Sequence, residues 1–179
     1  MFRRSISKLL EARLSEERAF IQIVLGPRQT GKTTAVRQAL AASGLPTHYV
    51  DADRFRETPS TQIALEWQQA RMLTAREGKA VLFIDEVQKI DDWAGVIKAL
   101  WDEDSWHETP LMVVLSGSSS LLLQKGLSDS LKGRFELIRS PHWTFSEMNE
   151  AFGYDLETFL LRGGYPGAAR IAEEQRWLA

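Results

Sequence analysis

The sequence predicts an α/β fold in which a parallel β-sheet of about five strands is flanked by helices, with a short helical C-terminal segment. Short apolar runs alternate with segments of helical period. The run over residues 80–84 is apolar throughout, as expected for a strand covered on both faces. After Pro141 the runs shorten and the period is helical, so the sheet is expected to end there. We therefore divide the chain into a core over residues 1–140 and a helical C-terminal extension over residues 141–179.

The expected elements follow one another in a regular order. Apolar runs predict five strands, over residues 20–25, 47–50, 80–84, 111–115 and 135–138. Helices are expected over residues 6–14 and 32–42, from Ser60 to Gly78, and after Asp92, whose side chain is expected to cap the helix. The spacing of apolar residues in this last helix predicts one buried stripe, formed by Trp93, Val96, Ile97, Leu100 and Trp101.

Composition limits the functions that the chain can have. The formal net charge of −2 gives no global basic field, so a nucleic-acid partner stays open but is not indicated. The chain has no cysteine, which excludes disulfides, thiolate metal sites and cysteine nucleophiles. No apolar run approaches the roughly 20 residues that span a bilayer, and no apolar stretch of a signal peptide follows the basic start of the chain. We therefore expect a cytoplasmic protein without a membrane partner.

Residues 26–33, which we call the phosphate loop, match the pattern G-x-x-x-x-G-K-[ST] in full between an apolar run and a helical segment. Gly26 and Gly31 permit a backbone path that turns several N–H groups into one concavity, and the following helix adds its positive end. Lys32 supplies a charge for the β- and γ-phosphates of a nucleotide, and Thr33 a hydroxyl for Mg²⁺. The alternative is a glycine-rich turn with a surface lysine, but a turn does not require Lys-Thr. The residues expected to bind nucleotide are Gly26, Pro27, Arg28, Gln29, Thr30, Gly31, Lys32, Thr33 and Thr34.

Two carboxylates follow the apolar run over residues 80–84. Asp85 would lie beside the phosphate loop if the two strands are near neighbours, and it is then expected to hold Mg²⁺ together with Thr33. Glu86 is expected to orient and deprotonate a water molecule for attack on the γ-phosphate. The alternative is a solvated loop, in which Gln88 and Lys89 follow the acidic pair.

The fourth and fifth strands contribute two further candidates. Ser116, at the tip of the fourth strand, is expected to sense the γ-phosphate or the attacking water, while capping of the next helix accounts for the serines that follow. Arg134 precedes the fifth strand and is either a surface charge or a γ-phosphate contact. The three histidines have no partners at metal-ligand spacing, so we expect no transition-metal site. The six tryptophans are expected to pack mainly in the core.

Several motifs in register resemble one family over nearly the whole chain. They are residues 26–33, Phe-Ile-Asp-Glu-Val-Gln-Lys-Ile at 83–90 with Trp93 behind it, Leu-Ser-Gly-Ser-Ser-Ser at 115–120, Leu-Lys-Gly-Arg at 131–134, Phe-Ser-Glu at 145–147 and Gly-Gly-Tyr-Pro at 163–166. This set is similar to the AAA-type ATPases, P-loop NTPases of the AAA+ superfamily, in the group that joins an AAA domain to a DUF4143 domain.

The resemblance implies ATP and Mg²⁺ as cofactors and a strand order in which the Ser116 strand lies between the phosphate-loop strand and the Asp85 strand. It implies Walker A roles for Lys32 and Thr33, Walker B roles for Asp85 and Glu86, a sensor role for Ser116, and an arginine-finger role for Arg134 within a homo-oligomer. Members of the group usually continue into a nuclease-like or DNA-binding-like domain, whereas this sequence stops at Ala179. Functions of such a domain are therefore not carried over.

The sequence thus predicts a Mg²⁺-dependent ATPase that couples hydrolysis to conformational change. One alternative is a P-loop kinase, against which Glu86 and the lack of an evident acceptor-binding lid argue. A GTPase would need an Asn/Thr-Lys-x-Asp signature, which does not occur. A third alternative is a regulatory module that binds nucleotide with negligible turnover, and phosphate release by the purified chain would separate it from the enzyme.

Overall fold

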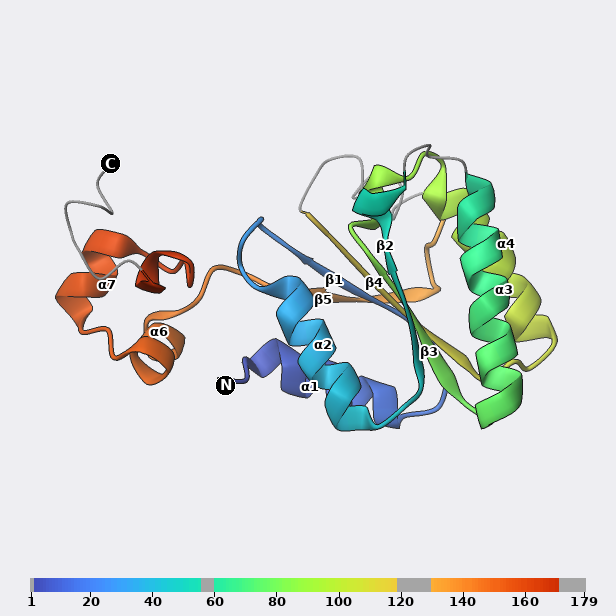
Figure 1. Ribbon diagram of the computed structural model, residues 1–179, viewed down its shortest axis with the longest axis horizontal. Coiled ribbons are helices and arrows are strands. Elements are labelled where there is room, and N and C mark those ends of the chain that lie inside the picture. The colour runs from blue at the N-terminus through green and yellow to red at the C-terminus, as the bar shows by residue number, and fades with distance from the viewer. Residues whose placement is uncertain (1, 56–59, 119–129, 171–179) are drawn as a thin grey trace.

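The computed structural model describes residues 2–55, 60–118 and 130–170. Helices α1 and α2 lie on one side of a central sheet, and α3 and α4 on the other (Figure 1). The described helices are α1 (Ser5–Ser15), α2 (Lys32–Ser43), α3 (Ser60–Glu77), α4 (Trp93–Trp106), α6 (Phe145–Phe152) and α7 (Leu156–Arg162). The strands are β1 (Ile21–Gly26), β2 (Thr47–Asp51), β3 (Ala80–Asp85), β4 (Leu111–Ser118) and β5 (Phe135–Arg139). The expected α/β architecture is confirmed.

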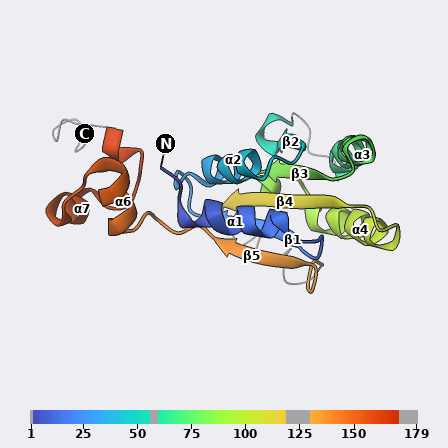
Figure 2. The ribbon, with the colours of Figure 1, turned by 90° about the horizontal axis from the view of Figure 1, so that it is seen from below.

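The sheet is parallel throughout, in the order β2-β3-β4-β1-β5. Figure 2 shows the strands stacked in this order. Strand β4 therefore lies between β1 and β3, as the resemblance implied. Parallel strands all end at the same edge, so the residues that follow β1, β3 and β4 are brought together. We call this the carboxyl edge of the sheet, and the opposite one the amino edge.

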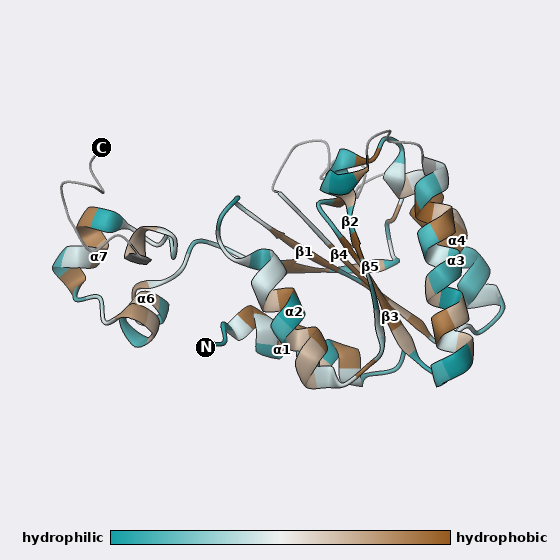
Figure 3. Cartoon of the chain, in the orientation of Figure 1, coloured by the Kyte–Doolittle hydropathy of each residue, from teal (hydrophilic) through white to brown (hydrophobic). Residues whose placement is uncertain are grey.

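Both faces of the sheet are buried, which explains the nearly continuous apolar strands (Figure 3). On one face, Trp67 and Ile63 of α3 and Ile97 of α4 pack against alternate strand residues. On the other, α1 and α2 pack through a second cluster, which includes Leu10 and Val36. Fully burying a side chain of this size stabilises the fold by about 1.5–3 kcal/mol. The two helical layers thus fix the sheet from both sides.

Three details differ from the expected elements. Strand β4 runs three residues past Leu115, through Ser118, because its far end pairs with β1 as well. Asp92 precedes α4 with φ of 49° and its side chain makes no capping hydrogen bond, so the expected cap is wrong. Trp106 is 85% exposed, in contrast to the buried Trp67, so core packing does not account for all described tryptophans. The serines at 119 and 120, expected to cap a helix, lie outside the described residues.

The segment after β5 contains two short helices and a small buried cluster. Helices α6 and α7 and a 3-10 turn (Ala168–Arg170) lie apart from the sheet (Figure 1). Helix α6 begins with a complete capping box between Thr144 and Glu147. Trp143, Met148 and Tyr154 form a small buried cluster, and Phe2 packs against it. The N-terminal residues therefore contact the C-terminal extension. That the extension is a unit separate from the core, with a boundary at residue 140, stays a prediction.

Candidate functional site

The phosphate loop leaves the sheet between β1 and α2 and is held by its own backbone and one side chain. Gln29 and Gly31 have φ values of 63° and 79°, the left-handed conformation that turns the chain sharply. The Thr30 side chain is fully buried, and its hydroxyl donates to the Pro27 carbonyl at 3.0 Å. Helix α2 begins at Lys32 without a side-chain cap, so the N–H groups of its first turn remain available to an anion.

Gly26 is required for a reason that the loop motif does not reveal. The Ser140 N–H donates to the Leu25 carbonyl at 2.6 Å, which brings the end of β5 against the end of β1. A Cβ atom on Gly26 would overlap the Ser140 carbonyl. Any other residue at position 26 would therefore push apart the two strands from which the phosphate loop and the C-terminal extension leave the sheet.

Lys32 carries a buried charge without an ion-pair partner among the described residues. Its side chain is 5% exposed, and its Nζ donates to the Pro27 carbonyl at 2.8 Å. Burial lowers the pKa of Lys32, and attraction by Glu86 and Asp85 offsets this only in part. An ammonium group has three donors, and one of them is used here. The loop therefore holds a cation with free donors, which suits an anionic ligand.

Asp85 lies at the end of β3 and is held by neutral donors. It is 4% exposed, and its Oδ2 accepts from the Thr33 hydroxyl at 2.7 Å. Its Oδ1 accepts a short hydrogen bond from the Ser116 hydroxyl and another, at 3.1 Å, from the Glu86 N–H. Hydroxyl and carboxylate oxygens are the ligands that Mg²⁺ prefers. Thr33 and Asp85 therefore fit a magnesium ion at this edge by chemistry and proximity.

Glu86 directly follows this carboxylate in a strained turn. Its φ of 55° places a non-glycine residue in the left-handed region, which costs of order 1–3 kcal/mol and often marks functional positions. The carboxylate is half-buried and accepts a hydrogen bond from the Gln88 side chain. Among the groups that attract the Lys32 charge, Glu86 is the strongest. Glu86 is therefore a partly exposed carboxylate at the same edge as the phosphate loop.

Arg134 does not lie at the carboxyl edge of the sheet, where the phosphate loop is. Its carbonyl accepts from the Ile21 N–H at 2.8 Å, at the start of β1, so it lies at the amino edge. The six residues of β1 place about 17 Å between the two edges. The guanidinium pairs with Asp102 of α4 through Nε and Nη2, at 2.6 and 3.0 Å. A γ-phosphate contact of Arg134 with its own phosphate loop is therefore ruled out by position, while a role toward another subunit stays a prediction.

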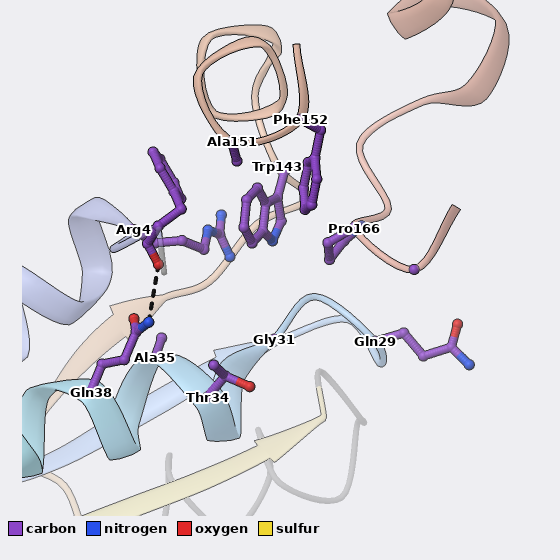
Figure 4. Close-up of a pocket in the computed structure, with 12 residues that line it drawn as sticks. Arg4, Gln29, Gly31, Thr34, Ala35, Gln38, Trp143, Ala151, Phe152 and Pro166 are labelled. Atoms are coloured by element: carbon purple, nitrogen blue, oxygen red, sulfur yellow. Dashed lines mark hydrogen bonds between the residues drawn. The ribbon is translucent and has the colours of Figure 1, made fainter. Parts of the chain in front are cut away.

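A cavity of about 510 Å³ opens beside the phosphate loop, between α2 and the C-terminal extension (Figure 4). The α2 side contributes Gly31, Thr34 and Ala35. The opposite side contributes Trp143 and Phe152, whose rings lie 5.5 Å apart. In Figure 4 the Gln29 side chain points away from the α2 helix and from Trp143. The cavity thus continues the phosphate loop into a space with an aromatic wall.

The geometry agrees with a comparison to known families. The model of a family described as AAA domain matches residues 18–149. This chain belongs to that family. Membership indicates a nucleotide-binding, ATPase-like domain, and the five-stranded parallel sheet is the corresponding P-loop fold.

Relatives of this AAA domain are longer proteins. Uncharacterized proteins of Mycobacterium bovis and Mycobacterium tuberculosis are each 31% identical over 149 residues, which is 83% of this chain and 30% of theirs. An uncharacterized protein of Haemophilus influenzae is 25% identical, with 86% of this chain and 41% of the relative covered. The chain therefore spans less than half the length of these curated relatives.

Two residues at the site were not predicted from the sequence. Arg4 is 3% exposed and donates to the Thr30 carbonyl of the phosphate loop at 3.1 Å. The Trp143 ring N–H donates to the same carbonyl at 2.9 Å. No short pattern marks either residue, because each bond joins segments that are distant in sequence. An arginine amid an otherwise unremarkable N-terminal segment gives no signal of its burial.

No described helix is long and apolar enough to cross a bilayer. Within the same parts of the chain, no group of three or more histidine, aspartate or glutamate side chains is arranged to hold a metal ion.

Proposed function

We propose that this AAA domain binds ATP with Mg²⁺ at the phosphate loop, hydrolyses it, and uses the change of nucleotide state to drive a conformational change. One observation carries the proposal: among the described residues, the buried charge of Lys32 has no ion-pair partner, and it lies at the same edge as Asp85, a carboxylate to which only neutral groups donate. A buried cation and anion that do not pair with each other need ligands of their own. A magnesium–triphosphate complex supplies both charges at once.

The roles follow from the contacts of each side chain. Lys32 and the first-turn N–H groups of α2 would bind the β- and γ-phosphates. Thr33 and Asp85 would hold Mg²⁺, which neutralises phosphate charge when bound. The Ser116 hydroxyl donates to Asp85, so it would orient that carboxylate. When Mg²⁺ binds the carboxylate oxygens, this hydrogen bond would change, and Ser116 would respond to the bound metal. This is how we interpret its predicted sensor role.

Glu86 would act as the general base. In the proposed reaction, a water oxygen forms a bond to the γ-phosphorus while the bond from this phosphorus to the β–γ bridging oxygen breaks. Glu86 accepts the proton of the water, and the products are ADP and inorganic phosphate. The turn that carries Glu86 fixes its backbone next to Asp85, which would keep the base and the metal ligand together.

The nucleoside end would occupy the cavity between α2 and the C-terminal extension. Its lining includes Gly31 of the phosphate loop and Thr34 directly after it, and the side formed by Trp143 and Phe152 is aromatic. A purine base stacks favourably on such a wall, by about 1–3 kcal/mol per ring contact. Removal of the Phe152 ring should therefore lower the affinity for ATP. The affinity for inorganic triphosphate, which has no base, should stay unchanged.

Calorimetry with ATP and Mg²⁺ tests the proposal. Lys32→Ala removes charge-assisted contacts worth about 1.5–3 kcal/mol, so affinity should fall by about ten- to a hundredfold. The matched control is Lys98→Ala, which removes a half-exposed lysine paired with Asp102 and should not change affinity. Unchanged affinity in a folded Lys32→Ala protein would refute the proposal. Tight binding without phosphate release would favour the regulatory module over the enzyme.

A further inference from the structure

The guanidinium of Arg4 joins three segments of the chain at one point. All five of its N–H donors have acceptors: both carboxylate oxygens of Glu147, the carbonyls of Thr30 and Pro141, and the Ser140 hydroxyl. The side chain is 4% exposed. Lysine could supply only three donors, so no other side chain could make this set of contacts. The set links the N-terminal segment, the phosphate loop and the C-terminal extension.

The Thr30 carbonyl is the contact that bears on nucleotide binding. It accepts from Arg4 Nη1 at 3.1 Å and from Trp143 Nε1 at 2.9 Å. A trans peptide is planar, so its carbonyl and its N–H point in opposite directions. Two donors on the Thr30 carbonyl therefore also fix the direction of the Gly31 N–H, which belongs to the same peptide group.

Other contacts hold the neighbouring groups: the Thr30 hydroxyl donates to the Pro27 carbonyl, and the Gly31 carbonyl accepts from the Ala35 N–H at 2.9 Å. None of these bonds is made by the Thr30 carbonyl or the Gly31 N–H. Gly31 has φ of 79°, and no atom lies within 4 Å of the position that a Cβ would take. Glycine also lacks the steric limits that hold other residues in one conformation. Without the two donors, the orientation of the Thr30–Gly31 peptide would be less restricted, and the Gly31 N–H would be less firmly fixed for an anion.

We propose that Arg4 is a positioning residue of the phosphate loop, which together with Trp143 presets the Gly31 N–H for binding a phosphate group. The proposal rests on the proposed nucleotide site. Arg4 is in turn held by Glu147, whose α6 helix belongs to the C-terminal extension. A displacement of the extension would therefore release the loop peptide, and occupancy of the loop would favour the docked position of the extension.

Inorganic triphosphate is the probe, because it contacts the loop and has no base to enter the cavity. Arg4→Lys and Trp143→Phe each remove one donor from the Thr30 carbonyl, and each should weaken triphosphate binding by about two- to tenfold in calorimetry. The double variant leaves the carbonyl with neither donor. Its loss should exceed the product of the two single losses, because either donor alone still orients the peptide.

Arg71→Lys is the matched control. Arg71 is likewise a largely buried arginine in an ion pair, here with Glu103 and Asp104, but it lies between α3 and α4, away from the loop. The Arg71→Lys substitution should lower the melting temperature as Arg4→Lys does, but it should leave the affinity for triphosphate unchanged. A second readout is the Gly31 amide resonance, which should broaden in Arg4→Lys before any ligand is added and stay sharp in Arg71→Lys.

The outcomes separate this inference from the proposed function. If wild-type protein binds triphosphate, Lys32→Ala does not, and both Arg4→Lys and Trp143→Phe bind as wild type does, the positioning role is wrong while the nucleotide site stands. An equal loss of affinity in Arg71→Lys would also overturn it, since general destabilisation would then explain the effect. If wild-type protein binds no triphosphate at all, both proposals fall.

Discussion

Two buried aspartates near opposite edges of the sheet are held in contrasting ways. Asp104, in the contact between α3 and α4, is 1% exposed and accepts from Arg71 Nε and Trp67 Nε1, each at 2.7 Å. Asp85, at the carboxyl edge, is 4% exposed and accepts from two hydroxyls and a backbone N–H. Among the described residues, no cation lies within ion-pair distance of Asp85.

The difference shows what each region of the sheet is built for. Burial of a charge costs several kcal/mol, and an arginine beside Asp104 offsets that cost. At the carboxyl edge, no ion pair among the described residues offsets this cost for Asp85 or Lys32, and hydrogen bonds and attraction by nearby charges offset it only in part. Packing alone would have favoured a direct pair between them or apolar residues in both places. Buried charges of both signs at one edge, without ion-pair partners among the described residues, are therefore the physical signature of the proposed ligand site.

The largest effect is expected from a substitution that compares two glutamates in the same backbone conformation. Glu86 at the carboxyl edge and Glu108 before β4 both have left-handed φ values, 55° and 51°. Glu86→Gln should bind ATP with Mg²⁺ normally while steady-state phosphate release falls by about 10²–10⁴-fold, because the base is lost. Glu108→Gln should turn over at the wild-type rate. Equal turnover in the two variants would make Glu86 a bystander.

The two aspartates themselves give the next largest effect. Asp104→Asn leaves the Arg71 charge without its buried partner and should lower the free energy of unfolding by about 2–4 kcal/mol. This is somewhat less than for a fully buried pair, because the Arg71 side chain is partly exposed to solvent. Asp85→Asn removes an uncompensated charge and should leave stability unchanged or raise it, while Mg²⁺-dependent ATP binding is lost. Urea denaturation and calorimetry on both variants measure this. A large loss of stability in Asp85→Asn would contradict the proposed difference between Asp85 and Asp104.

The Arg4–Glu147 ion pair adds a third case to the comparison, because its contribution to stability should depend on pH. Burial raises the pKa of Glu147, but hydrogen bonds from Arg4 and Thr144 outweigh it, so the pKa lies below its ordinary value. A depressed carboxylate pKa stabilises the fold above the unfolded value, about 4.5, and this stabilisation is lost as pH falls through the folded value.

Wild-type protein should therefore be more stable than Glu147→Gln at pH 6, and the difference should shrink below about pH 4. Urea denaturation of both proteins at the two pH values tests this, and the exposed pair of Arg76 and Glu77 supplies the control, because Glu77→Gln should show little difference at either pH. A difference that grows on acidification would contradict the assignment.

The smallest effect is expected at Arg134. The guanidinium is 31% exposed and its partner Asp102 39%, and such pairs contribute at most about 1 kcal/mol. If this pair is its only role, Arg134→Ala should keep full ATP turnover. The arginine-finger hypothesis predicts instead an inactive variant that a Lys32→Ala protein partly rescues on mixing, since one intact loop can then meet one intact arginine. Rescue would establish a homo-oligomer, and inactivity without rescue would indicate a role in the fold.

The sheet could be predicted from sequence because its signals are local. The apolar run from Ala80 to Ile84 and the loop between Gly26 and Thr33 each depend on neighbours in the chain, and both occur where expected. The position of β4 between β1 and β3 came from the family resemblance, since strand order has no local signal. The positions of Thr33, Asp85 and Ser116 at one edge then follow from parallel pairing.

The remaining contacts could not be predicted because they join distant segments. Arg4 meets Glu147 across nearly the whole chain, and Trp143 reaches Thr30 from the segment after β5. The missing cap at Asp92 also escaped prediction: its backbone is left-handed and its side chain makes no capping hydrogen bond to α4. Arg134 shows the same limit: its sequence position suggested a phosphate contact, whereas the direction of β5 places it at the opposite edge.

The strand order also determines when this site can form during synthesis on the ribosome. Strand β1 emerges early, but both of its neighbours, β4 from Leu111 and β5 from Phe135, are made much later. At about 5–20 residues per second, the nascent β1 waits on the order of ten seconds for its first partner. Strands β2 and β3 can pair in the meantime. Nucleotide bound at the proposed site would therefore not assist the early steps of folding, because the strands on both sides of β1 are made late.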